Sequence, residues 1–279
     1  MIQLLLGLVY LLAHAPDQCE PTERLAPPGW QGNFWGPSAN QGRREGKMPK
    51  VPMTALMINW QNWGKKTLKS GDIVFRRGDA RVLFGYFRFS RFAANVDNSA
   101  FSHTGVVAIE NGEPVVYDTT KAGVACQPFG VWILDNVGAL GVKRLRPEHR
   151  GAVPKALAYC HKVFQQQVPF DYEFGLDDSK LYCVEMTEKA FLAAGISLSQ
   201  PVPVGDMERA GEFPFSMLGL HYASGWVLDR PISFEDRVYV PGNDHHGLWG
   251  SPFLVTVFPA TDVAALTVPE LGPGAADHD

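Results

Sequence analysis

The chain has 279 residues, of which 46% are hydrophobic and 19% charged, and its formal net charge is -4. This length allows one large domain with extensions, or two small domains. The composition is that of a soluble globular protein and offers no basic stripe to neutralise phosphates. We therefore expect no nucleic acid as a partner.

Residues 1–15 are almost wholly apolar. The run is too short for a transmembrane span and suits the apolar region of an export signal, although no Lys or Arg precedes it and Pro16 follows it. If it is a signal peptide, the protein is extracytoplasmic, either periplasmic or secreted. If it is instead a core strand or helix, the protein is cytoplasmic.

The cysteines are Cys19, Cys126, Cys160 and Cys183, and no Cys-x-x-Cys pair occurs. This spacing is not that of a metal or redox motif. In an exported protein some of the first three could form disulfides, and the sequence leaves their pairing open.

The first part of the chain, residues 16–66, is expected to be an irregular extension, because residues 27–37 are rich in Pro and Gly. A short helix is expected at 53–63, and a turn followed by a strand at 68–75. Residues 81–95 carry aromatic residues interleaved with arginines, which predicts a helix or lid-like segment. An amphipathic helix with a solvated face is the simpler interpretation; contact of residues 81–92 with a membrane surface is the alternative.

A hairpin should follow, with strands at 101–110 and 113–118 joined by Asn111 and Gly112. A strand followed by a turn is expected at 124–134, a further strand at 140–145, an amphipathic helix at 152–166, and a short strand at 170–174. Late strands are expected at 226–227 and 238–240. The small, acidic tail at 267–279 is expected to be disordered.

Cys183 begins a segment in which apolar residues recur at helical spacing, and turn-forming residues 175–179 precede it. A helix starting there would place the thiol beside unpaired backbone N–H groups and the positive end of the helix dipole. Both favour a thiolate, and the N–H groups can stabilise an oxyanion. The simpler alternative is a buried core cysteine.

His103 and Asp118 are the partners that such a thiolate needs. If Asn111 and Gly112 form a two-residue turn, Gly105 lies opposite Asp118. The carboxylate is then diagonal to His103 on the same face of the hairpin. It could hold the imidazole in one tautomer and stabilise its charged form. The sequence thus predicts a catalytic Cys183–His103–Asp118 triad.

Other histidines offer weaker signals. Asp244, His245 and His246 could bind a metal, but adjacent histidines in a Gly- and Asn-rich loop are more often exposed to solvent. We therefore expect no metal and no cofactor. Cys160 and His161 are adjacent on a helix, so their side chains point about 100° apart and form a poor catalytic pair.

Four motifs occur in a fixed order: GDIVF at 71–75, SHTGVV at 102–107, FDYEF at 170–174 and LYCVE at 181–185. Together they resemble the YiiX-like, circularly permuted papain-fold amidases, which are related to the NlpC cell-wall peptidases and the lecithin–retinol acyltransferase group. The resemblance covers residues 68–200. In that family the histidine strand precedes the cysteine helix.

The resemblance implies an α+β fold in which an antiparallel β-sheet or barrel packs against the helix that carries the nucleophile. It also implies a thiol hydrolase that cleaves amide bonds of peptides or cell-wall peptide fragments. Cys183 takes the place of the nucleophile and His103 that of the base. Asp118 stands where relatives often have Glu, and Val184 where they often have Ser. Glu185 matches a recurrent acid, expected to compensate the helix dipole.

Candidate substrate-binding residues are Tyr182, Tyr172 and Ser102, and packing is the simpler alternative for either tyrosine. We expect a catalytic domain at 67–240, followed by a C-terminal extension at 241–279. Two alternatives keep the fold. One is a lipid acyltransferase or thioesterase of the lecithin–retinol type, and the other is a non-catalytic binding domain.

Overall fold

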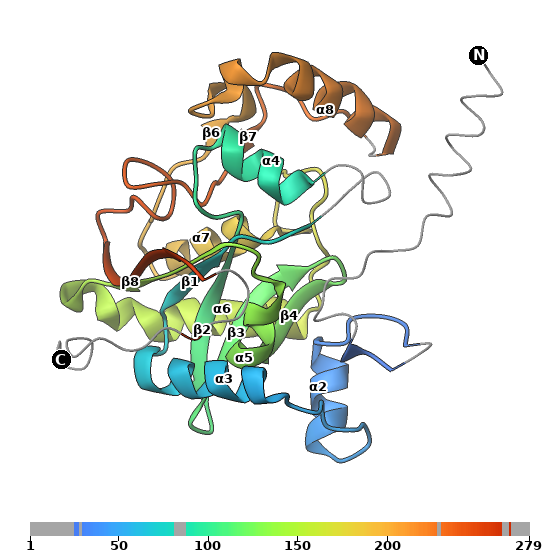
Figure 1. Ribbon diagram of the computed structural model, residues 1–279, viewed down its shortest axis with the longest axis vertical. Helices are drawn as coiled ribbons and strands as arrows, with labels where there is room; N and C mark the ends of the chain where they lie inside the picture. The colour runs from blue at the N-terminus through green and yellow to red at the C-terminus, as the bar shows by residue number, and fades with distance from the viewer. Residues whose placement is uncertain (1–24, 28–29, 81–87, 228–229, 264–267, 269–279) are drawn as a thin grey trace.

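The computed structural model describes residues 25–27, 30–80, 88–227, 230–263 and 268 (Figure 1). The expected export signal and nearly all of the expected disordered tail lie outside these residues, as do residues 81–87 of the aromatic segment. Within the described part, no helix has both the length and the apolar character needed to span a membrane.

A six-stranded sheet in the order β4-β3-β2-β1-β5-β8 forms the centre, and all its neighbouring strands are antiparallel. The strands are β1 (Ile73–Arg76), β2 (His103–Glu110), β3 (Glu113–Thr120), β4 (Gly123–Pro128), β5 (Ala139–Leu145) and β8 (Leu254–Asp262). The predicted hairpin is present between β2 and β3. Glu110 pairs with Glu113, and Asn111 and Gly112 have φ angles of 53° and 80°, as a tight hairpin turn requires.

Helices cover both faces of this sheet. One face carries α6 (Val153–Gln165) and α7 (Cys183–Leu192), and the other carries α3 (Ala55–Thr67) and α5 (Phe129–Trp132). Because side chains alternate along a strand, Val106 packs on the α6–α7 side and Val107 on the α3–α5 side. The expected α+β arrangement, with an antiparallel sheet against the Cys183 helix, is confirmed.

A third group of elements, which we call the cap, has a small core of its own. It consists of α4 (Phe89–Val96), α8 (Pro214–Val227), the 3₁₀ helices η4 (Val204–Asp206) and η5 (Ala210–Glu212), and the strand pair β6 (Val202–Pro203) and β7 (Arg237–Val238). Buried residues from these elements, including Val96, Val204 and Met217, form one apolar cluster. Figure 1 shows α4, α8 and the β6–β7 pair together at the top of the molecule, beyond the sheet and α7.

Two predicted strands are wrong. Residues 170–174 make only one isolated bridge, between Phe170 and Leu181, and Phe174 has a φ of 54°, which interrupts an extended backbone. Residues 226–227 are the end of α8. The strand expected at the start of 124–134 is present as β4, and in place of the expected turn the chain forms α5 and the 3₁₀ helix η2 (Ile133–Asp135).

The flanking segments are more regular than expected. Within residues 16–66, α2 (Pro37–Arg44) begins at Pro37, a residue suited to a first helical turn, and α3 is longer than predicted. A 3₁₀ helix η3 (Pro147–Ala152) precedes α6. In the expected C-terminal extension, β8 pairs with β5 along the edge of the central sheet, so residues beyond 240 belong to the main fold.

Candidate active site

Helix α7 begins at Cys183, as the sequence predicts. The preceding Tyr182 has an extended backbone, and its N–H donates to Glu185 Oε2 at 3.3 Å. Glu185 is buried and its Oε1 lies 2.9 Å from Lys189 Nζ. Burial outweighs this ion pair and raises the pKa of Glu185 to about 7. Glu185 therefore caps the N-terminus of the helix that carries the Cys183 thiol.

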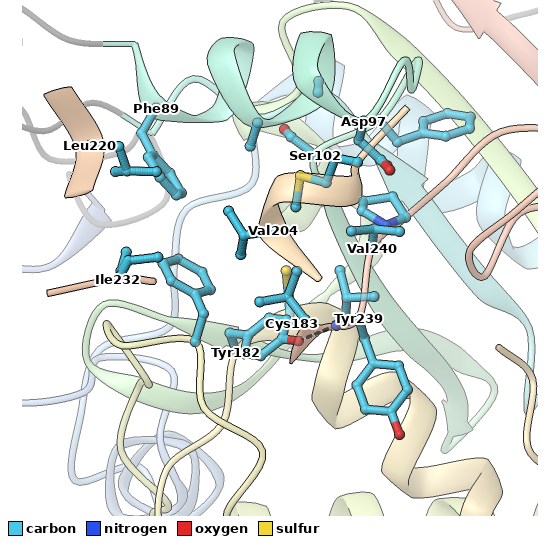
Figure 2. Close-up of a pocket in the computed structure, with 18 of the residues that line it drawn as sticks. Phe89, Asp97, Ser102, Tyr182, Cys183, Val204, Leu220, Ile232, Tyr239 and Val240 are labelled. Carbon is cyan, nitrogen blue, oxygen red and sulfur yellow. Dashed lines mark hydrogen bonds between the residues drawn. The ribbon is translucent and has the colours of Figure 1, made fainter. Parts of the chain in front are cut away.

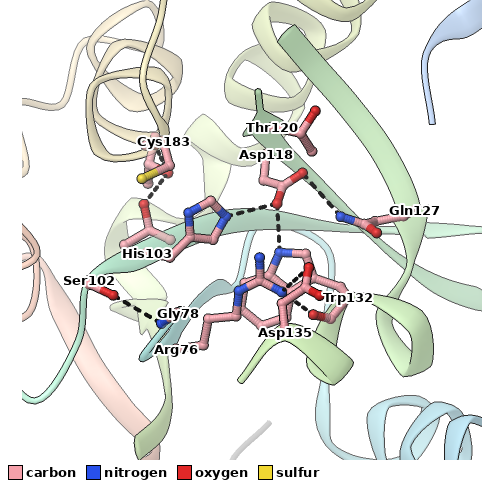
Figure 3. Close-up of polar contacts among 12 residues, drawn as sticks. Arg76, Gly78, Ser102, His103, Asp118, Thr120, Gln127, Trp132, Asp135 and Cys183 are labelled. Carbon is pink, nitrogen blue, oxygen red and sulfur yellow. Dashed lines mark hydrogen bonds and ion pairs between the residues drawn. The ribbon is translucent and has the colours of Figure 1, made fainter. Parts of the chain in front are cut away.

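His103 and Asp118 lie where the hairpin register predicts. Val106 pairs with Tyr117, which brings Asp118 beside Gly105 and diagonal to His103. His103 Nε2 is 2.9 Å from Asp118 Oδ2 (Figure 3). Gly105 has no room for a side chain, since an added Cβ would lie 3.3 Å from Asp118 Cβ and closer still to Val116. The glycine thus allows the carboxylate to approach the imidazole.

Asp118 is fully buried, and neighbouring side chains fix its carboxylate. Trp132 Nε1 donates to Asp118 Oδ2 at 2.8 Å, and Gln127 Nε2 donates to Oδ1 at 3.5 Å. Because the same Oδ2 also binds His103, the indole sets the direction in which the carboxylate meets the ring. Sequence reasoning missed both donors. Trp132 reaches the site because the chain turns over the sheet directly after β4.

Arg76 forms a second layer behind Trp132. Its guanidinium lies 4.4 Å above the centre of the indole ring, and its Nη1 donates to the Trp132 backbone oxygen. The same nitrogen is 3.3 Å from Asp135 Oδ2. Arg76 is therefore a buried cation that holds the tryptophan in position and is paired with a carboxylate.

Cys183 occupies the opposite side of the imidazole. Figure 3 shows its sulfur beside the His103 ring, on the side away from Asp118. Burial alone would raise the pKa of the thiol. The charge of His103, a hydrogen bond to its ring and the Thr104 backbone N–H outweigh burial and lower the pKa of Cys183. Nothing in the sequence indicates the Thr104 contact.

His103 shows the complementary shift. Burial and the charge of Arg76 oppose protonation, but the Cys183 thiolate and the hydrogen bonds to Asp118 and Cys183 raise the pKa of His103 to about 10. The two shifts are complementary and both favour the ionised pair, a thiolate beside an imidazolium. The other described cysteines differ: burial raises the pKa of Cys160 to about 12 and that of Cys126 further. No disulfide joins the three cysteines of the described region.

The comparison with protein families decides the classification. Residues 67–209, just over half of the chain, match the family described as "Permuted papain-like amidase enzyme, YaeF/YiiX, C92 family". The chain belongs to this family.

Relatives of this chain are found in Escherichia coli. The "Uncharacterized protein YiiX" of strain K12 is 24% identical over 193 residues, which cover 68% of this chain and 85% of that protein. A crystal structure of yiiX from strain O157:H7, whose title calls it a metalloprotein, matches with a TM-score of 0.55 at 21% identity. That match covers 68% of this chain and 96% of the crystallised chain, and it confirms the fold.

Cys183 lines a cavity of about 110 Å³ between α7 and the cap (Figure 2). Ser102 and Tyr182, two of the expected substrate-binding residues, line the cavity. The Tyr182 hydroxyl accepts a hydrogen bond from the Tyr239 N–H at 2.6 Å, so it also ties the cap to α7. Tyr172 is not among the lining residues; it is 49% exposed and donates to the Lys121 backbone oxygen at 3.2 Å.

The residues considered for a metal point to separate partners. His246 Nε2 is 2.8 Å from Asp97 Oδ1, and Asp244 accepts from Trp249 Nε1 at 2.9 Å. His245 is exposed. In the region that the structure describes, no three His, Cys, Asp or Glu side chains form a group suited to a metal ion.

Proposed function

We propose that this protein is a cysteine amidohydrolase in which Cys183 is the nucleophile, His103 the acid–base and Asp118 the residue that orients the imidazole. The observation that carries the proposal is the position of the His103 ring. Its Nε2 is bound to a buried carboxylate and its other side faces a cysteine at a helix N-terminus. Membership of an amidase family supports the same assignment.

The reaction would follow from this geometry. The Cys183 thiolate attacks the amide carbonyl carbon, and the carbonyl oxygen takes the negative charge. Backbone N–H groups in the first turn of α7 stabilise that oxyanion. The His103 imidazolium gives its proton to the amide nitrogen, the C–N bond breaks, and the amine leaves a thioester on Cys183. His103 then takes a proton from water, whose oxygen attacks the thioester and releases the acid and the thiolate.

Asp118 acts through its contact with the imidazole. Its hydrogen bond to Nε2 directs the opposite ring nitrogen toward Cys183 and stabilises the imidazolium. The first donor to the oxyanion is the N–H of Cys183 itself. Ser102, which lines the same cavity, is a candidate for a further contact with the substrate carbonyl.

For the substrate, we propose the amide bonds of peptides or of cell-wall peptide fragments. Export through residues 1–15 would bring the enzyme to such substrates, and it remains a proposal. Transfer of the acyl group to another acceptor is the alternative. It predicts that added amines or alcohols compete with water for the thioester.

The donor set does not suit a metal in this reaction. The E. coli yiiX structure is titled a metalloprotein. In this chain, however, His103 binds Asp118 on one side and faces Cys183 on the other. The described part of the chain has no group of three side chains suited to a metal ion. We therefore derive no step through a metal.

The first test is the pH dependence of Cys183 alkylation by iodoacetamide, followed by mass spectrometry of the peptide that contains Cys183. We expect fast labelling in the wild type at pH values well below the ordinary thiol pKa. In His103→Ala the titration should move toward the ordinary thiol pKa of about 8.5. Cys160, whose thiol is buried without a base, is the internal control and should label only after unfolding.

An ordinary thiol titration of Cys183 in both proteins would refute the catalytic assignment and leave a non-catalytic domain. If the thiolate is present, a panel of p-nitroanilides with peptidyl, aminoacyl and fatty acyl groups measures amide hydrolysis directly. Cys183→Ala should abolish turnover of every member, and Cys160→Ala should retain it.

A further inference from the structure

A second cavity, of about 280 Å³, lies at the end of β1 opposite to the triad. His103 pairs with Arg76, the last residue of β1, whereas this cavity borders the turn that precedes β1. That turn, the end of β5 and the segment that joins η3 to α6 surround it. None of the residues that line it also lines the cavity at Cys183, so the two spaces are separate.

The residues that line this second cavity carry positive charge. Lys69, Arg144 and Arg150 are among them, and no Asp or Glu of the described chain is. Asp72 binds Arg144 and compensates one of these charges. Glu148, two residues before Arg150, is exposed and does not line the cavity. The N-terminus of α6 borders the same space, and its first turn contains no acidic residue. These features together favour an anion.

Arg144 is held in a fixed orientation at this cavity. The antiparallel pairing of β1 with β5 brings the fully buried Asp72 beside it. Arg144 Nε donates to Asp72 Oδ1 at 2.6 Å, and Nη2 donates to Oδ2 at 2.7 Å and to the Thr67 backbone oxygen at 3.0 Å. Within the described chain, Nη1 is left without a hydrogen-bond partner, so this nitrogen is available to a ligand.

Arg150 and Ser70 add two further donors. Arg150 Nε is buried and has no hydrogen-bond partner among the residues that the structure describes. A buried donor without an acceptor is unfavourable, and more so on a charged group. Ser70 Oγ accepts from the Ile109 N–H at 3.0 Å, which leaves the hydroxyl hydrogen for another acceptor. A ligand with several oxygens in this cavity would supply the acceptors that both side chains lack.

The arrangement of these donors favours a tetrahedral anion over a carboxylate. A carboxylate has two oxygens in one plane and matches a single guanidinium fork, and the fork of Arg144 is already occupied by Asp72. The remaining donors belong to three segments: β5, η3 and the turn before β1. A phosphate group presents three acceptor oxygens in different directions. At about 280 Å³ the cavity exceeds the about 30 Å³ of one water, so such a group has room.

We infer that this cavity binds a phosphate group, either the free ion or one carried by a larger molecule, through Arg144, Arg150 and the Ser70 hydroxyl. The site uses no residue of the triad, so the inference is independent of the proposed function. Bound phosphate would link three segments that are distant in the sequence. Because it binds the folded chain, it would also stabilise that chain against unfolding.

Calorimetric titration and thermal unfolding of the full chain with inorganic phosphate test the site, with NaCl used to hold the ionic strength constant. We expect a saturable rise in Tm with phosphate. In Arg150→Gln the phosphate affinity should fall at least about tenfold, because a hydrogen bond between two charged groups is lost. Without phosphate this variant should unfold at the wild-type Tm or above it, since the buried donor that lacks an acceptor is gone.

Two more variants make the result specific. Arg44→Gln removes the same charge from an exposed position on α2 and should bind phosphate as the wild type does. Ser70→Ala removes the hydroxyl donor and should weaken binding roughly two- to tenfold. Because Ser70 is exposed, this variant also serves if Arg150→Gln does not fold.

Three probes identify the ligand class. Tighter binding of glycerol 3-phosphate than of inorganic phosphate supports a phosphate carried by a larger molecule, and the reverse order supports the free ion. Acetate that binds as tightly as phosphate would reject the tetrahedral anion. The inference would be overturned if phosphate had no effect beyond that of NaCl, or if wild type and Arg150→Gln bound it equally. A lower Tm of Arg150→Gln with unchanged phosphate affinity would show a purely structural arginine.

Discussion

Cys183 lies between a polar wall and an apolar wall that differ in how they are held. On the sheet side, Asp118 is fully buried and contacts His103 and Gln127 on the neighbouring strands and Trp132 on α5. On the cap side, apolar side chains from separate short elements meet in a small core of their own. The sheet side can therefore fix the ionisation of the thiol, while the cap sets which substrate fits. Substitutions on the sheet side and in the cap should separate these roles.

Replacing Asp118 with Asn should have the largest effect. The uncharged amide cannot stabilise the imidazolium, and it offers Trp132 and His103 a different set of donors. We expect kcat for the best p-nitroanilide to fall roughly 10²–10⁴-fold. Glu148→Gln removes a carboxylate at an exposed position and should keep wild-type kcat. Equal activity of the two variants would show that the carboxylate is dispensable.

The pH–rate profile of amide hydrolysis should be broad. Below the lowered pKa of Cys183 the thiolate is protonated, so activity falls as the pH decreases. Above the His103 pKa of about 10 the proton needed by the leaving amine is lost, so activity falls again. Steady-state rates between pH 4 and pH 11 measure both limbs. A single rise centred near the ordinary thiol pKa would contradict the ion pair.

Gly105→Ala should test how closely β2 and β3 pack against each other at the triad. The added Cβ would lie 2.4 Å from Val116 Cγ1 and 3.1 Å from the Tyr117 oxygen. We expect the free energy of unfolding to fall by about 1–3 kcal/mol, because a packed sheet has to move apart. Urea denaturation measures it. Gly211→Ala, where an added Cβ meets no atom within 4 Å, is the control and should be nearly neutral.

Trp132→Phe removes the indole N–H and keeps most of the ring. The charged Asp118 carboxylate then loses one hydrogen-bond donor. We expect kcat to decrease about tenfold and the pKa of His103, measured by NMR titration, to change. Trp249→Phe removes an indole N–H that binds Asp244, away from the triad, and should leave the His103 titration unchanged.

Changes in the cap should matter least to the chemistry of the thiol. Ile232→Ala enlarges the cavity, and we expect the rate of iodoacetamide labelling to stay within about twofold of wild type, since the charged and hydrogen-bonding groups that lower the thiol pKa, His103 and Thr104, lie on the sheet. A larger change would mean that the apolar wall also controls ionisation, and the division between the two walls would fail.

Local signals explain what the sequence could predict. The Asn111–Gly112 turn fixes the hairpin register, and the register brings Asp118 to His103. The start of α7 at Cys183 follows from helical spacing after a run of turn residues. These contacts depend on neighbours along the chain or across one hairpin, so they can be deduced residue by residue.

The missed features depend on contacts between distant segments. Trp132 meets Asp118 only because α5 folds back over the sheet, which no periodicity reveals. Helix α8 escaped detection because its apolar residues face both the cavity and the outside, so it lacks the single apolar stripe that marks a surface helix. Phe174 adopts a left-handed backbone within a segment that reads as a strand.

The position of β8 has a practical consequence for any shortened form of the protein. The family match ends at residue 209, yet β8 covers the edge of β5 along its whole length, from Ala139 to Leu145. A chain ending before residue 254 would keep the triad and expose a row of unpaired backbone N–H and C=O groups on β5. Such an edge recruits strands from other molecules, so truncation would promote self-association while the catalytic residues remain in place.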